Sequence, residues 1–228
     1  MTNRANLVLT GLTGLVVLLV AALSASAARA DAEYTGFFEQ RELAEAGWST
    51  CSTLTWTVDV TGLTTRQARI EVRALKMAWA TWSASAGIRV EYSGRERLAY
   101  DPSTYGLRPV GGAPRTDHHV YIAFKTTSQV PIMARNAVGL AMPTAVIPAT
   151  QEITAGMTIF RRGYVVEQRR NSPDRIAHLY IHELGHVLGL GHAGSARNVM
   201  HPTLGELTRL GDGDAAGIRD ITRPCPAS

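Results

Sequence analysis

The sequence predicts an α+β fold, in which strands alternate with helices and the C-terminal part is rich in helix. One observation is the run from Leu54 to Val60, where apolar residues alternate with polar ones at the period of a half-buried strand. A second is the run from Val72 to Ala86, where apolar residues recur at helical spacing. A third is the last part of the chain, where two segments carry helix start signals.

The first helix is expected to begin after Thr64, which forms a capping box with Gln67, and to end at Gly87. Four further segments have the composition of strands, and they span residues 88–92, 120–124, 137–142 and 153–160. The third of them is followed by Pro143, and a strand next to a proline often lies at a sheet edge. Residues 94–117 and 126–136 are predicted to be loops.

A second long helix is expected to open at Ser172, because serine caps a helix start and Pro173 fits the first turn. Asp174 suits the positive end of the helix dipole. A last helix is expected to open with Asp212 and to run to about Ile221.

The first 30 residues have the features of a signal peptide. Arg4 supplies the positive start, residues 7–23 are an apolar run, and Ala28-Arg29-Ala30 is a cleavage site with small residues at both ends. An uncleaved membrane anchor is the alternative, and it would leave the protein associated with the cell envelope. We expect cleavage, and a secreted or extracellular protein without a stable membrane span.

The mature chain would begin near Asp31. Residues 31–50 form a short leader, too short for a folded propeptide, and residues 51–228 form one domain. Cleavage would remove two arginines and no acid, which lowers the formal net charge from +4 to +2. This charge is too mild to indicate nucleic acid as a partner.

Residues 182–192 carry the chemistry and read H-E-x-x-H-x-x-G-x-x-H. His182 and His186 are four residues apart, so on a helix they lie on one face, one turn apart. Gly189 can end that helix, and the reversed chain can then bring His192 back as a third ligand. Three nitrogen ligands with an open fourth position describe a catalytic zinc site. Glu183 lies beside the metal and can act as a general base.

This motif, together with the segment Asn198-Val199-Met200-His201-Pro202, resembles the metzincin zinc metalloproteases, and Pro202 after the methionine is similar to the matrixin pattern. The segments 51–56 and 211–218 also resemble small secreted bacterial matrixin-like peptidases. The resemblance implies that the three histidines bind one zinc ion, that Glu183 is the general base, and that Met200 lies beneath the metal in a Met-turn.

The resemblance also implies a zincin-like metzincin catalytic domain. Such a domain has a twisted five-stranded mixed sheet, two long helices, and a small C-terminal lobe containing a third helix. One edge strand pairs with the backbone of an extended peptide or protein substrate. The matching segment here makes Gly139, Leu140 and Ala141 the candidates for the substrate strand. Asp214 matches an aspartate that supports the Met-turn, and the protein is expected to be a monomer.

Cys51 and Cys225 are expected to form a disulfide, because export exposes them to an oxidising compartment. The alternative makes Cys51 a latch, whose thiolate binds the zinc and keeps the enzyme silent. Matrixin zymogens use a Pro-Arg-Cys-Gly type motif for this purpose, and the sequence around Cys51 does not contain it.

The remaining histidines are not expected to bind metal. Larger matrixins hold a second zinc and calcium ions, which requires several histidines and aspartates; here only His118 and His119 precede His178. We expect no second zinc, surface strand positions for His118 and His119, and no calcium, because helix capping explains Asp212 and Asp214. His178 is expected to be an ordinary packed or exposed histidine, with support of the metal ligands as the alternative.

Two functions are compatible with these observations. The first is a secreted zinc-dependent endopeptidase, in which activated water cleaves the peptide bond with Glu183 as general base. The second is a catalytically silent zinc-bound envelope protein of the same fold that binds peptides. Loss of activity in such a site usually removes the base, so the presence of Glu183 favours the enzyme.

Overall fold

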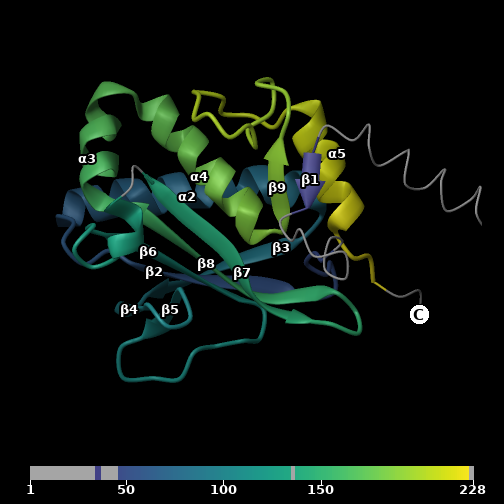
Figure 1. Cartoon of the computed structure of the whole chain (residues 1–228), viewed down its shortest axis with the longest axis horizontal. Coiled ribbons are helices and arrows are strands. Elements are labelled where there is room, and N and C mark those ends of the chain that lie inside the picture. Colours follow the sequence, from purple (N-terminus) through teal and green to yellow (C-terminus); the bar gives the residue numbers. More distant parts are fainter. Residues whose placement is uncertain (1–33, 37–45, 135–136, 226–228) are drawn as a thin grey trace, which may run out of the picture. The chain divides into compact units, whose positions relative to one another are not determined.

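A five-stranded mixed sheet forms the centre of the computed structural model, which describes residues 34–36, 46–134 and 137–225 (Figure 1). The strand order is β3-β2-β6-β8-β7. The bounds are β2 Thr53–Asp59, β3 Arg89–Arg95, β6 His119–Lys125, β7 Gly139–Ile147 and β8 Glu152–Arg161. Only β7 is antiparallel to its neighbour; the other pairs are parallel. The expected five-stranded mixed sheet is therefore confirmed, and it is combined with helices as the α+β expectation requires.

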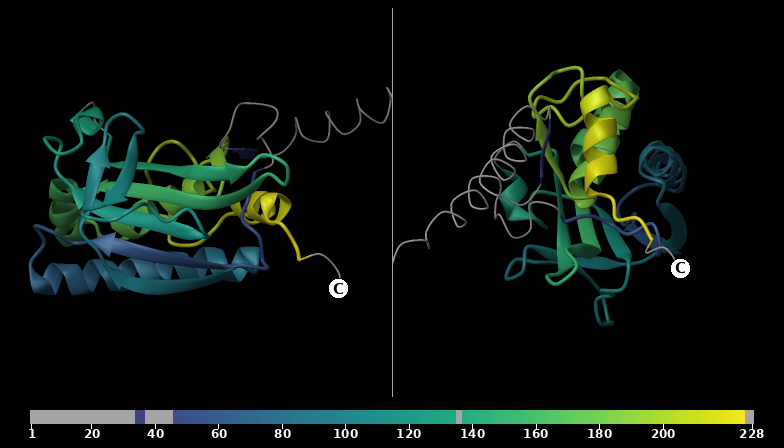
Figure 2. Two further views of the ribbon diagram at one scale, coloured as in Figure 1. Left: turned by 90° about the horizontal axis from the view of Figure 1, so that it is seen from below. Right: turned by 90° about the vertical axis from the view of Figure 1, so that its right-hand side faces the viewer.

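Four α-helices are present in the described ranges: α2 Thr65–Ala86, α3 Arg162–Asn171, α4 Pro173–Val187 and α5 Asp212–Ile221. The two long helices α2 and α4 pack against each other, and α2 runs alongside β3 (Figure 2). The main apolar core lies between these helices and the sheet, and its largest buried side chains include Trp56, Trp79, Trp82 and Tyr180. Burial of each such side chain contributes on the order of 2–3 kcal/mol.

The first helix has the predicted boundaries. The side chain of Thr64 accepts a hydrogen bond from the backbone N–H of Gln67, and the side chain of Gln67 accepts one from the backbone of Thr64. This capping box satisfies donors at the helix start. Gly87 caps the other end in the left-handed conformation.

The sequence-based assignment missed α3, so the domain has one helix more than expected. Its ten residues are mostly polar and bury only Val165, so they show no apolar period. The expected start of the next helix is correct in position, with Pro173 in the first turn. Ser172, however, makes no side-chain capping hydrogen bond, because α3 and α4 follow each other directly and its N–H bonds to the carbonyl of Gln168.

Two other expectations also need correction. The strand at the sheet edge does not end at Pro143, because β7 continues to Ile147 through register shifts around that proline. Its place at the edge is confirmed. The predicted loop 94–117 contains an antiparallel hairpin, with β4 at Leu98–Asp101 and β5 at Gly106–Pro109. The predicted loop 126–136 contains a short 3-10 helix, Pro131–Ala134.

The hairpin covers the sheet face opposite the helices. Leu98 and Leu107 pack with buried residues of β6 and β8 in a second, smaller apolar cluster. A buried ion pair anchors the hairpin: Lys125 donates to Asp59 at 2.7 Å and to the Leu98 carbonyl at 2.6 Å. Asp59 also accepts from the Leu98 N–H at 3.0 Å.

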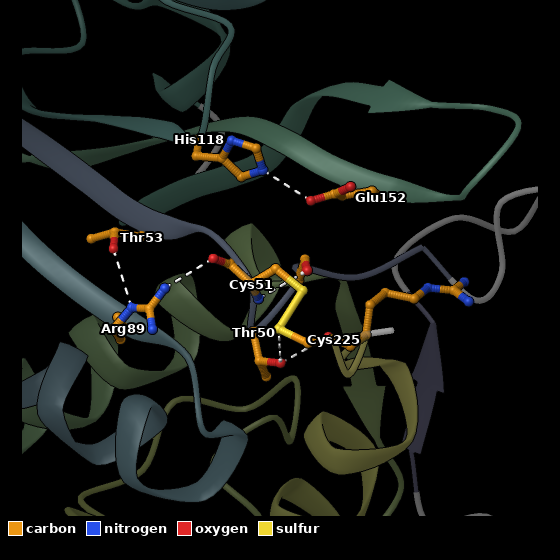
Figure 3. The surroundings of a disulfide bond; sticks show 9 residues. Thr50, Cys51, Thr53, Arg89, His118, Glu152 and Cys225 are labelled. Carbon is orange, nitrogen blue, oxygen red and sulfur yellow. Dashed lines mark hydrogen bonds and ion pairs between the residues drawn. A yellow bond between two sulfur atoms is a disulfide. The ribbon is translucent and has the colours of Figure 1, made fainter. Parts of the chain in front are cut away.

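A disulfide joins Cys51 to Cys225, with 5.2 Å between the Cα atoms (Figure 3). The backbone around it is paired as well, because the Thr50 N–H donates to the Arg223 carbonyl at 2.8 Å. Arg89 at the start of β3 donates to the Cys51 carbonyl at 2.9 Å. A Cys51 that is bonded to Cys225 has no thiolate to bind a zinc ion, so the alternative role of Cys51 as a latch is excluded for the oxidised protein.

The short strand β1, Tyr34–Gly36, pairs with β9, Leu190–Ala193, in an antiparallel ladder. Part of the expected leader is thus a strand of the domain. The expected signal peptide at residues 1–30 lies outside the described residues, as do 31–33 and 37–45. Among the helices that the structure describes, none is long and apolar enough to cross a membrane.

Candidate metal centre

Helix α4 supplies two of the three predicted ligands, and it buries nearly every residue of its second half. His182 and His186 lie one turn apart, and their ring centroids are 4.7 Å from each other. Their Nε2 atoms face each other at 3.1 Å. The helical spacing in the sequence therefore produces two converging imidazoles.

The hydrogen bonds of the other ring nitrogens define the tautomers. Nδ1 of His182 lies 2.8 Å from the Val199 carbonyl, and Nδ1 of His186 lies 2.8 Å from the Leu190 carbonyl. A carbonyl oxygen only accepts, so both Nδ1 atoms carry hydrogen. Burial lowers the pKa of His182 to about 3 and of His186 to about 4, so both rings are neutral at pH 7. Each Nε2 atom then carries a lone pair and no hydrogen, and the two lone pairs face each other.

The third imidazole comes from the strand that follows the helix. Gly189 has φ of 104°, a left-handed conformation that lets the chain reverse after α4. The reversed chain forms β9, and His192 on this strand is exposed to solvent. The candidate ligand atoms of His182, His186 and His192 all lie within 4.8 Å of one another.

These residues fit a zinc ion. Tetrahedral zinc with bonds of about 2.0–2.1 Å places its nitrogen ligands about 3.3 Å apart. The two facing Nε2 atoms are at 3.1 Å, close to that separation, and no hydrogen lies between them. A cation shared by both lone pairs removes their repulsion, and the exposed third ring leaves one side open to solvent.

Glu183 lies between the first two histidines in sequence and is almost fully buried, with 7% of its surface exposed. Burial raises the pKa of its carboxyl group to about 8. A cation beside the group favours the ionised form and lowers this pKa. The structure also shows why the neighbouring strand has glycine at position 139: a Cβ atom there would overlap the Glu183 carboxylate.

The turn at Met200 is held by Asp214 of α5, which is fully buried. Its carboxylate accepts hydrogen bonds from the backbone N–H groups of Val199 at 2.6 Å, Met200 at 3.0 Å and Gly211 at 2.8 Å. Because the Val199 carbonyl in turn accepts from His182, this turn orients a ligand. The Met200 side chain is buried in the core, directly against Gly185 of α4.

Three groups in this site were not identified from the sequence. Asn198 is buried, and its Oδ1 accepts from the backbone N–H groups of Gly213 and Asp214, which joins the turn to α5. The carbonyls of Leu190 and Val199 fix the two tautomers. The position of Asn198, two residues before Met200, could have indicated a role in the turn. Backbone carbonyls such as those of Leu190 and Val199 cannot be identified from the sequence.

Neither His118 nor His119 has the expected surface strand position, because His118 lies just before β6 and His119, the first residue of β6, is buried. His119 is not at the surface: it is buried, and its ring nitrogens bond with Thr55 at 2.7 Å and Thr57 at 3.1 Å on β2. His118 is partly exposed and bonds with Glu152 at 2.9 Å (Figure 3). His178 is packed, as expected, and its Nδ1 accepts from the Leu207 N–H at 2.9 Å.

The substrate-strand candidates lie at the open edge of the sheet. Gly139, Leu140 and Ala141 form the start of β7, which is the last strand in the sheet order. β7 lies against α4, so the start of this edge lies beside Glu183. An edge strand exposes backbone N–H and C=O groups that can pair with another chain.

The chain was compared with protein families, curated proteins and solved structures. Residues 113–222 match the model of the matrixin family, Peptidase_M10. The match supports a matrixin-like, metzincin-like domain and, at the level of the family, a zinc metallopeptidase. Among solved structures, the GM1-bound form of the ECX AB5 holotoxin is similar at 13% identity, over 84% of this chain and 89% of that chain, with a TM-score of 0.45. No curated protein matches the sequence.

Proposed function

We propose that the protein is a secreted zinc-dependent endopeptidase with Glu183 as its general base. One observation carries the proposal: two neutral, buried imidazoles present facing Nε2 atoms at 3.1 Å, and the carboxyl group of Glu183 follows directly on the same helix. The match to the matrixin family supports it.

In the proposed hydrolysis, the zinc ion and Glu183 have separate roles. Zinc, when bound by His182, His186 and His192, supplies a Lewis acid that makes water acidic near neutral pH and polarises a carbonyl. Glu183 takes a proton from the attacking water and passes it to the leaving amine. The nearly dry surroundings of Glu183 keep this proton transfer away from bulk solvent.

The substrate is an extended polypeptide that pairs with β7. The open edge at Gly139, Leu140 and Ala141 supplies the backbone groups, and Gly139 lies directly against the Glu183 side chain. A peptide paired there passes close to the base with its backbone extended. The proposal includes no nucleic-acid partner, and the protein acts as a monomer.

Secretion is supported by the disulfide, which persists in oxidising compartments. The expected signal peptide at residues 1–30 belongs to the same proposal. N-terminal sequencing of the exported protein tests it, with Asp31 as the expected first residue.

The function is tested by cleavage of casein or of a fluorogenic peptide library, with and without a chelator. Glu183→Gln keeps the shape of the side chain and removes the base, so we expect turnover to fall at least a thousandfold while one zinc per chain stays bound. Glu167→Gln, at an exposed glutamate on α3, is the matched control and should retain full activity. His186→Ala should lose the zinc as well as the activity.

Two outcomes would contradict the proposal. Cleavage at the wild-type rate by Glu183→Gln would exclude Glu183 as the base. A wild-type protein that binds zinc and peptides without cleaving any library member would identify a binding module instead.

A further inference from the structure

A second concave region lies at the edge of the sheet opposite β7, beside β3. A cavity of about 550 Å³ opens between α2 and β3. Its lining includes Trp56, Trp79 and Tyr92, together with Lys76, Ala80 and Ser83 of α2 and Val90 and Glu91 of β3. None of these residues takes part in the metal centre.

Among the described residues, β3 is the first strand in the sheet order and pairs only with β2, so its other edge is open. Val90 and Tyr92 are partly buried and pack against the main core, which α2 also covers, whereas Arg89, Glu91 and Ser93 alternate with them and are exposed. A groove between an edge strand and a helix is a geometry that binds an extended peptide by strand addition. The alternate side chains of such a peptide enter the groove.

Aromatic side chains form one wall of the cavity. Trp56 and Tyr92 lie with ring centroids 4.5 Å apart, and the Lys76 ammonium lies 4.6 Å from the centroid of Tyr92. Trp79 is 2% exposed, and its indole N–H has no hydrogen-bond acceptor among the described residues.

The charges along the groove select an acidic partner. The exposed charged side chains of α2 are the four cations Arg66, Arg69, Arg73 and Lys76, and the one carboxylate that lines the cavity is Glu91. The acidic residue of α2, Glu71, is buried and paired with Arg169 at 2.5 Å. The four cations of α2 are spaced at three and four residues, so they form one stripe on the helix, and Lys76 belongs both to the stripe and to the cavity.

We propose that the groove between α2 and β3 binds an extended, acidic segment of polypeptide, which adds a strand to β3 and places apolar side chains in the cavity. This site is separate from the metal centre, so it does not depend on cleavage. In a peptidase, such a site captures the substrate chain away from the bond that is cut.

The probe is a fluorescently labelled heptapeptide in which glutamate alternates with leucine, and its binding is measured by anisotropy. The protein carries Glu183→Gln, so that the peptide stays intact. We expect saturable binding that weakens at least tenfold in Ala80→Glu, because the added carboxylate occupies the cavity mouth and repels the ligand. Met77→Glu is the matched control, since Met77 is 66% exposed on the same helix and does not line the cavity; binding should stay within about twofold.

Two further peptides separate the parts of the proposal. The same sequence with lysine in place of glutamate should not bind, and N-methylation of alternate backbone amides should abolish binding if the peptide pairs as a strand. Equal binding by Ala80→Glu, by the lysine peptide or by the N-methylated peptide would overturn the proposal, as would the absence of binding at millimolar concentration. Loss of peptide cleavage alone would refute the proposed function and leave this site intact.

Discussion

Replacement of Asp214 by alanine should destabilise the protein by about 3 kcal/mol, because two buried backbone donors and one partly buried donor lose their acceptor. The carboxylate is fully buried and accepts from Val199, Met200 and Gly211. Each orphaned N–H group costs about 1–3 kcal/mol, and the costs are not fully additive within one turn. Asp214→Asn keeps one acceptor oxygen and should cost about half as much.

The measurement is urea unfolding of the metal-free protein in excess chelator, which separates the turn from the contribution of zinc to stability. Asp212→Ala is the matched control, because Asp212 stands in the same first turn of α5 and is exposed. Its cost should stay below about 1 kcal/mol.

Asp214→Ala also tests whether the turn at Met200 supports metal binding. The Val199 carbonyl orients His182, so a loosened turn should weaken zinc binding by about 10–100-fold in a chelator competition. A loss of stability below 1 kcal/mol in Asp214→Ala would show that the turn does not depend on this carboxylate. Unchanged zinc affinity in a clearly destabilised Asp214→Ala would separate the turn from the ligand, contrary to our reasoning.

Three further predictions concern the base, acid stability and the disulfide. Gly139→Ala should lower turnover about a hundredfold without loss of zinc, since its Cβ displaces the Glu183 carboxylate, whereas Gly163→Ala, where a Cβ meets no atom within 4 Å, should not. Burial raises the pKa of Asp59, but hydrogen bonds led by that from Lys125 outweigh it and leave the pKa below 3.8. Its stabilisation should therefore be complete above that pH and lost on acidification below it, and urea unfolding from pH 5 to 2.5 should show a shallower acid loss in Asp59→Asn. Reduction of the disulfide, which spans 174 residues of sequence, should lower the unfolding free energy by up to about 5 kcal/mol, and an unchanged midpoint with free thiols would contradict this.

The arrangement of the three histidines in the candidate metal centre could be predicted because most of its information is local. His182 and His186 converge through the pitch of one helix, and Gly189 reverses the chain within three residues. The alternation in β2 and the capping box of α2 are likewise readable over a few residues. Such features depend on backbone geometry that neighbouring residues determine.

The features that the sequence did not predict depend on contacts between distant segments. His119 looked like a surface residue, and its burial results from Thr55 and Thr57, more than sixty positions earlier in the chain. The polar helix α3 has no apolar stripe, and it is held by Arg169, which bonds with the buried Glu71 of α2. No periodicity in the sequence encodes these partners.

The disulfide also has a mechanical consequence. Tension applied between the segment before Cys51 and the segment after Cys225 passes from one sulfur to the other, so the folded chain between them bears no load. The strand β1 precedes Cys51 and lies outside this covalent loop. A pull on the N-terminal segment therefore strips β1 from β9, the strand that carries His192, before the tension reaches the covalent bond. Stretching the ends of this protein therefore acts first on the edge of the candidate metal site and on the bonds that Gly47 and Trp48 make with β8 and α4.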